Sequence, residues 1–145
     1  MKLVIQRVSS AKVEVDNKTV SSIGPGLLIL QGIAQDDDGS QIDWLARKVV
    51  EMRIFNDHQD KMNRSLKDIN GEILLVSQFT LYADCRKGRR PGFTEAALPE
   101  KAEKMYEDLA EVLSGYGIKV KMGIFGAHMQ ISLVNDGPVT IILER

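Results

Sequence analysis

The chain has 145 residues, a net charge of −1 and a single cysteine, Cys85. Its near-neutral charge argues against a general polyanion-binding protein such as a DNA-wrapping factor, but it allows a local basic patch. One cysteine excludes an internal disulfide framework and a cysteine-rich zinc site, and it favours the cytoplasm. No apolar run approaches the ~20 residues of a membrane span, and the charged N-terminal segment is typical of a strand, so no membrane partner is expected.

The first half of the chain predicts a β-meander followed by a helix. Strands are expected at residues 2–8, 12–15, 19–23 and 27–30. A helix is expected to begin near Ser40, because apolar side chains then recur on one helical face. These side chains are Ile42, Leu45, Val49 and Met52.

The second half predicts one more helix among strands. The turn dipeptide Asn70-Gly71 precedes an expected strand at 72–82, and a helix is expected at about 100–114 after Pro99. Strands are then expected at 118–125, 129–134 and 139–144. The pattern favours a single α+β domain over residues 1–145: a curved, mostly antiparallel β-sheet or partial barrel with two main helices packed on it.

The standard catalytic signatures are absent from the chain. It has no Walker A motif, no strand-linked GxGxxG, no HExxH and no GxSxG. We expect His58 to be exposed, His128 to be structural or superficial rather than a general base, and Cys85 to be incidental. No metal ion or cofactor is expected. An enzyme with this sequence would have to use backbone groups or its own substrate for chemistry.

The segment Ser77-Gln78-Phe79-Thr80-Leu81-Tyr82 is the strongest positive signal. It is compatible with a strand that leaves the core with side chains on alternating faces. It is also compatible with a substrate cradle, in which Phe79 stacks on a base and exposed N–H groups hold a developing oxyanion.

A basic cluster follows this segment. Four cations lie within five residues, at Arg86, Lys87, Arg89 and Arg90. The cluster is either a solvated loop or a phosphate-binding loop, since Lys and Arg contact nucleic-acid backbones without reading sequence. A short loop in a near-neutral protein fits contact with the end of an RNA better than the wrapping of a long duplex, so DNA is not expected as a partner.

The third signal is Gly137-Pro138, within the segment Asn135-Asp136-Gly137-Pro138-Val139-Thr140. Proline lacks an N–H and is excluded from central strands, so these residues alone favour a β-turn between two strands. A Pro after Gly can also form a cis peptide at small cost, which would direct backbone carbonyls where regular structure cannot.

Together these segments resemble a known family. Ser77-Gln78-Phe79-Thr80-Leu81 and the segment around Gly137-Pro138 are similar to the two signature motifs of D-aminoacyl-tRNA deacylases. Shorter stretches agree in order and spacing, at residues 5–8, 26–28, 53–55, 61–63 and 125–129. One departure is Gly92 in Arg90-Pro91-Gly92-Phe93, where the family more often has Ser.

The resemblance implies a homodimer that hydrolyses the ester between a D-amino acid and the 3′-terminal ribose of tRNA. It implies a cis Gly137–Pro138 peptide that reaches into the partner's active site and excludes the L side chain by backbone sterics. Arg7 would orient that motif, and Ala127 and Met129 would help to shape the site. The catalytic pocket would be lined by Ser77, Gln78, Phe79 and Thr80.

Two mechanisms and three functions stay open at this point. Thr80 could act as a nucleophile, or N–H groups near Phe79 and Thr80 could form an oxyanion hole while the ribose 2′-OH assists water; the lack of an evident base favours the second route. A steric filter would also admit glycyl-tRNA. The alternatives to a deacylase are a non-catalytic module that binds the tRNA end or a nucleotide, and an interaction protein in which Gly137-Pro138 is a plain turn.

Overall fold

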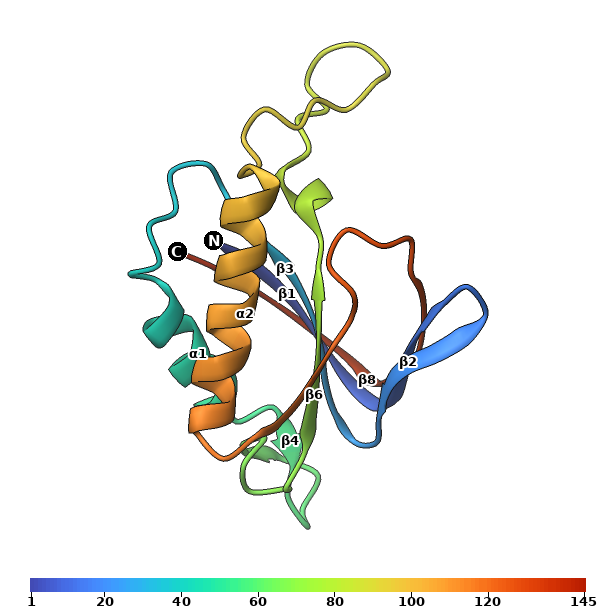
Figure 1. Ribbon diagram of the computed structural model, residues 1–145. Coiled ribbons are helices and arrows are strands. Elements are labelled where there is room, and N and C mark those ends of the chain that lie inside the picture. Colours follow the sequence, from blue (N-terminus) through green and yellow to red (C-terminus); the bar gives the residue numbers. More distant parts are fainter.

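The computed structural model describes all 145 residues, which form two helices on one face of a curved sheet that is nearly closed as a barrel (Figure 1). The strands are hydrogen-bonded in the order β2-β1-β3-β6-β7, and β8 also pairs with β1. β3 pairs with the first half of β1 and β2 with its second half, whereas β8 pairs with both halves. The strands of the sheet are β1 (Lys2–Val15), β2 (Lys18–Ile23), β3 (Gly26–Gly32), β6 (Glu72–Ser77), β7 (Lys119–Met122) and β8 (Gln130–Glu144). The helices are α1 (Ile42–Glu51) and α2 (Pro99–Gly115).

The sheet is mixed. β1 pairs antiparallel with β2, β3 and β8, whereas β3–β6 and β6–β7 are parallel pairs. Parallel neighbours need a crossover connection, and α1 and α2 lie within those two connections. A small separate sheet pairs β4 (Phe55–Asn56) with β5 (Met62–Arg64). The expected α+β class, with mostly antiparallel pairing and two main helices, is confirmed.

The core explains which strands are central. The larger apolar cluster lies between the sheet and the two helices, where Leu45, Leu75 and Leu109 are fully buried. A smaller cluster covers the other face and contains Val13, Leu28, Leu74 and Val76. β3 and β6 are therefore buried on both faces, which accounts for their continuous apolar runs.

Two expected strand breaks do not exist. Residues 2–8 and 12–15 belong to one strand, and residues 129–134 and 139–144 lie in the single strand β8, so the predicted turn at 135–138 is wrong. β1 pairs along nearly the whole of β8 and holds both halves in line. The strand accommodates Pro138 by a bulge: Val8 pairs with Asn135 and Gln6 with Thr140, so residues 136–139 lie opposite Arg7 alone.

The strand expected at residues 72–82 is shorter than predicted. It ends at Ser77 as β6, and the following η1 (Phe79–Tyr82) is a short 3₁₀ helix. The prediction of alternating faces through Tyr82 is therefore wrong beyond Ser77. β7 likewise ends at Met122 rather than at residue 125. No helix of the structure is both long and apolar enough to cross a membrane.

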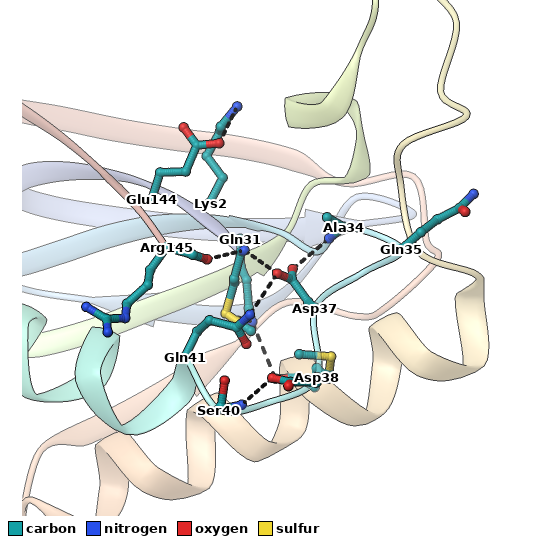
Figure 2. A network of polar contacts seen from close by, with 12 residues as sticks. Lys2, Gln31, Ala34, Gln35, Asp37, Asp38, Ser40, Gln41, Glu144 and Arg145 are labelled. Carbon is teal, nitrogen blue, oxygen red and sulfur yellow. Dashed lines mark hydrogen bonds and ion pairs between the residues drawn. The ribbon is translucent and has the colours of Figure 1, made fainter.

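Asp37 links several segments of the fold (Figure 2). Its carboxylate accepts hydrogen bonds from the Ala34 N–H at 2.7 Å, the Gln41 amide at 3.3 Å and the Met1 ammonium at 2.5 Å. The Met1 ammonium also donates to the Arg145 carbonyl at 2.7 Å. Asp37 is buried, and its partners satisfy both carboxylate oxygens, as a buried charge requires. The network fixes the turn that leads into α1.

Candidate functional site

One pocket is lined by five of the thirteen predicted site residues. It encloses about 670 Å³ at the end of β6, beside the start of α2 and the connection that follows β7. Ser77, Gln78 and Phe79 line one wall. Ala127 and Met129 line another, with His128 between them. The structure thus brings two segments of the sequence analysis to one cavity.

The turn from β6 into η1 shapes the first wall. The Gln78 N–H donates to the Gln31 carbonyl at 2.7 Å, and the Leu81 N–H donates back to the Gln78 carbonyl at 3.2 Å. The first N–H groups of a helix have no acceptor within it. Phe79 and Thr80 therefore present N–H groups that no backbone carbonyl of η1 accepts. Such a pair is a candidate oxyanion hole.

Phe79 stands at the mouth of the pocket. Its side chain is 55% exposed, and its ring meets that of Phe93 edge-on with centroids 5.0 Å apart. Leu98 also lines the pocket and is largely exposed. A mouth with exposed aromatic and aliphatic groups suits the flat face of an aromatic ligand such as a nucleobase. The sequence analysis did not assign Phe93 or Leu98 to the site, although an aromatic residue directly after a basic loop is a usable signal.

Gln31 is a second residue that sequence reasoning missed. It lies in β3, is 1% exposed and lines the pocket. Its side-chain amide donates to the Met105 carbonyl at 3.3 Å, and its Oε1 has no hydrogen-bond partner. No local pattern singles out this glutamine, because its position follows from β3 pairing with β6.

The hydroxyl of Thr80 lies outside this arrangement. Thr80 is exposed and does not line the pocket, and its Oγ1 accepts a hydrogen bond from the Gln78 side-chain amide. An amide is not a base, so this contact cannot activate a nucleophile. His128 is exposed at the pocket and His58 is exposed elsewhere, and neither forms a hydrogen bond with Thr80. The structure contains no cluster of three or more potential metal ligands.

The side chain of Arg7 binds the backbone next to Gly137-Pro138. It is only 5% exposed, and its Nε donates to the Asp136 carbonyl at 2.8 Å. Its Nη1 donates to the Ile54 carbonyl at 2.6 Å, which ties the segment to the connection after α1. The Gly137–Pro138 bond is cis, and Gly137 has φ +132°. Both residues are exposed and neither lines the pocket, so one chain does not unite the two motifs.

The basic loop also lies outside the pocket lining. Arg86 forms a two-pronged pair with Asp84, through Nε–Oδ1 and Nη2–Oδ2 contacts of 2.8 Å each. These bonds, with the Arg86 backbone N–H, hold the pKa of the Asp84 carboxyl down to about 2. Lys87, Arg89 and Arg90 are exposed and have no ion-pair partner.

Comparisons with known proteins agree over the whole chain. The sequence profile of a family described as "D-Tyr-tRNA(Tyr) deacylase" matches residues 4–144. The D-aminoacyl-tRNA deacylase of Thermosipho africanus (strain TCF52B) is 58% identical, over 99% of this chain and 97% of that protein. The protein of the same name from Clostridioides difficile (strain 630) is 54% identical over the same shares.

Two solved structures have the same fold. One is named "c-Myc DNA Unwinding Element Binding Protein" and is 41% identical, with a TM-score of 0.93 over 100% of this chain and 99% of that one. The other is described as a probable eukaryotic D-amino acid tRNA deacylase, with 16% identity and a TM-score of 0.86 over 98% of this chain and 97% of that one. The second likeness concerns the fold alone.

Proposed function

Because the chain belongs to the D-Tyr-tRNA(Tyr) deacylase family and is a hydrolase, we propose that it cleaves the ester between a D-amino acid and the 3′-terminal ribose of tRNA in the pocket beside η1. The observation that carries the proposal is the position of the Ser77–Thr80 motif. Ser77, Gln78 and Phe79 line the pocket at the end of a buried strand, and the first two N–H groups of the η1 turn that follows have no backbone acceptor.

Backbone groups supply the main catalytic effect in this proposal. The tetrahedral intermediate of ester hydrolysis carries a negative oxygen, and donors fixed in advance stabilise it more in the transition state than in the ground state. The N–H groups of Phe79 and Thr80 are such donors. The 2′-OH of the terminal ribose assists the attacking water, because Thr80 has no base as its neighbour. Phe79 stacks on the terminal base.

Handedness is selected by backbone rather than by a side-chain pocket. The enzyme has to accept many D side chains and reject one configuration, which a rigid steric obstacle achieves and a complementary pocket does not. Gly137 and Pro138 form this obstacle, oriented by Arg7. They lie outside the pocket of their own chain, so a second copy supplies them in a homodimer. The exposed apolar side chains of Val134 and Ile142 on β8 support such an interface.

The proposal also includes the binding partner of the enzyme and its location in the cell. The 3′ end of aminoacyl-tRNA is the partner, bound partly through the basic loop. The enzyme acts in the cytoplasm, where a substrate made for translation is found. Glycyl-tRNA is also cleaved, since glycine has no Cβ for a steric filter to reject. DNA is not a partner, although one similar structure is named for DNA binding.

A hydrolysis assay with matched substrates tests the proposed function. Purified protein is incubated with D-tyrosyl-tRNA, L-tyrosyl-tRNA and glycyl-tRNA, and the free amino acid is measured over time. We expect release from the D and glycyl substrates and at least about 100-fold slower release from the L substrate, a difference of about 2.7 kcal/mol in transition-state binding.

Each alternative has a distinct outcome in this assay. Binding of tRNA without release of any amino acid would favour the non-catalytic module. Release of D-tyrosine with complete retention of glycyl-tRNA would contradict the steric account of selection. Inhibition of D-tyrosine release by equimolar duplex DNA would contradict the exclusion of DNA.

A further inference from the structure

Residues 84–92 form a loop that projects from the body of the molecule beyond η1 (Figure 1). Two backbone hydrogen bonds close its base: the Asp84 N–H donates to the Gly92 carbonyl at 2.7 Å, and the Gly92 N–H donates to the Asp84 carbonyl at 2.9 Å. Gly88 lies between the basic residues with φ +71°, a conformation that glycine adopts readily. The loop therefore has a defined base and holds its cations away from the core.

Arg86 is engaged at the base of this loop. Its guanidinium binds both carboxylate oxygens of Asp84, and its Nη2 lies 3.8 Å from Glu95 Oε1. Its backbone N–H donates to the same Asp84 carboxylate at 2.9 Å. A planar guanidinium that bridges a carboxylate in this way is a strong and geometrically specific pair. A phosphate would have to compete with two acidic side chains for Arg86.

The other three cations differ from Arg86. Lys87, Arg89 and Arg90 are exposed, and none has a carboxylate within ion-pair distance. The loop connects directly to the pocket, because Gly92 is followed by Phe93, whose ring packs against Phe79 at the mouth. The base of the loop therefore lies next to the pocket.

We propose that Lys87, Arg89 and Arg90 bind backbone phosphates of the RNA strand whose 3′ end enters the pocket, whereas Arg86 stays paired with Asp84 and binds no phosphate. The inference rests on the proposed function for the identity of the strand. From the sequence alone, the four basic residues of the loop are equivalent candidates for phosphate contacts. The structure separates Arg86 from the other three. The charge of Arg86 is offset by that of Asp84 in this scheme, and the other three residues carry the electrostatic part of the affinity.

The salt dependence of binding distinguishes the two roles. The probe is tRNA carrying a D-amino acid through a 3′-amide linkage, which resists hydrolysis, and its association constant is measured over a range of salt concentrations. Each phosphate contact to a single strand contributes about 0.7 to the slope of log K against log salt. We expect Lys87→Gln, Arg89→Gln and Arg90→Gln each to lower the slope by about that amount, and the triple variant by about 2.

Arg86→Gln is the decisive comparison, because it removes the same charge from the same loop. We expect its slope to stay within about 0.3 of the wild-type value. Lys18→Gln on β2 removes an equal charge elsewhere and is the control for a general change in net charge. A triple variant with the wild-type slope, or an Arg86→Gln variant that loses as much slope as Lys87→Gln, would overturn the inference.

A separate hydrolysis assay shows whether the proposed deacylase function, rather than the phosphate contacts of the loop, is wrong. Wild-type protein is tested separately for hydrolysis of D-aminoacyl-adenosine, a substrate that has the ester but no phosphate. Absence of that activity would count against the deacylase site, whereas the salt slopes report on the loop in either case. All the substituted residues are exposed, so a thermal unfolding curve suffices to show that each variant is folded.

Discussion

Single residues decide where the chemistry of this site comes from. Thr80 belongs to η1 and carries a hydroxyl, yet its only side-chain hydrogen bond is with the Gln78 amide. Ser77 and Gln78 line the pocket but have no acidic or basic partner there. At this scale the structure offers oriented backbone dipoles and no activated nucleophile, which agrees with a mechanism that depends on N–H donors.

Thr80→Ala tests this conclusion. The substitution keeps the backbone N–H of residue 80 and removes the hydroxyl, so we expect kcat for D-tyrosyl-tRNA to stay within about tenfold of wild type. Single-turnover kinetics at saturating enzyme provide the measurement. Thr80→Ser, which retains a hydroxyl, is the matched control. A loss of roughly 10³-fold in the alanine variant, with activity retained in the serine variant, would establish a nucleophilic threonine.

β6 and α2 position the wall of the pocket that contains Met129. Gly123 directly follows β7, and its N–H donates to the Leu75 carbonyl at 2.9 Å, so β6 holds the start of the connection. The Tyr106 hydroxyl of α2 donates to the same carbonyl at 2.8 Å. A Cβ added at Gly123 would lie 2.6 Å from the sulfur of Met129, which lines the pocket. The absence of a side chain at Gly123 thus sets the position of Met129.

Gly123→Ala is expected to change substrate preference through Met129. The new methyl group has to displace the Met129 thioether, and that displacement alters the wall of the pocket. We expect KM for D-tryptophanyl-tRNA to rise by roughly three- to tenfold relative to KM for D-alanyl-tRNA, a change of about 1 kcal/mol of the size expected for overpacking. Steady-state kinetics on the two substrates measure the ratio.

Gly115→Ala is the matched control for this prediction. Gly115 ends α2, and a Cβ there meets no atom within 4 Å. Alanine should leave the KM ratio unchanged and raise the free energy of unfolding by up to about 1 kcal/mol, because glycine is a poor helix former. An unchanged KM ratio in Gly123→Ala would show that Met129 moves without affecting the substrate.

At the scale of the whole molecule, the two signature motifs occupy separate places. Ser77 and Phe79 line the pocket, whereas Gly137 and Pro138 are exposed on a bulge of β8 that Arg7 supports. Phe79, Val134 and Ile142 are all large apolar side chains that one chain leaves more than half exposed. In the proposed homodimer, a second copy would complete the site and cover some of these side chains, as an isologous two-fold interface permits.

Val134→Glu tests the dependence of activity on assembly. Val134 is exposed on β8 next to the bulge, so a charge there should leave the fold intact and oppose an apolar interface. We expect the wild type to have twice the monomer mass of 16.1 kDa by light scattering, and the variant to be monomeric with at least about tenfold lower kcat/KM. A fully active monomer, in either protein, would contradict a site shared between subunits.

The sequence by itself determined the local parts of this protein. Apolar runs and helical spacing were enough to place the core of β3 and β6 and both helices. A buried strand or a buried helix face requires those patterns whatever its neighbours are. The motifs around Ser77 and Gly137 were enough to suggest the family, and the missing catalytic signatures pointed to backbone chemistry.

Only the tertiary structure decided how distant segments meet. β8 runs on through Pro138 because β1 pairs with both of its halves, and Arg7 is buried because it reaches Asp136, 129 residues away. The strand ends at Ser77 because the Gln78 N–H makes the last hydrogen bond of the β3–β6 ladder, to the Gln31 carbonyl, and the chain then turns into η1. Arg86 differs from its neighbours because Asp84 is held beside it at the base of the loop. Each of these outcomes depends on a particular contact that residue type and local spacing do not specify.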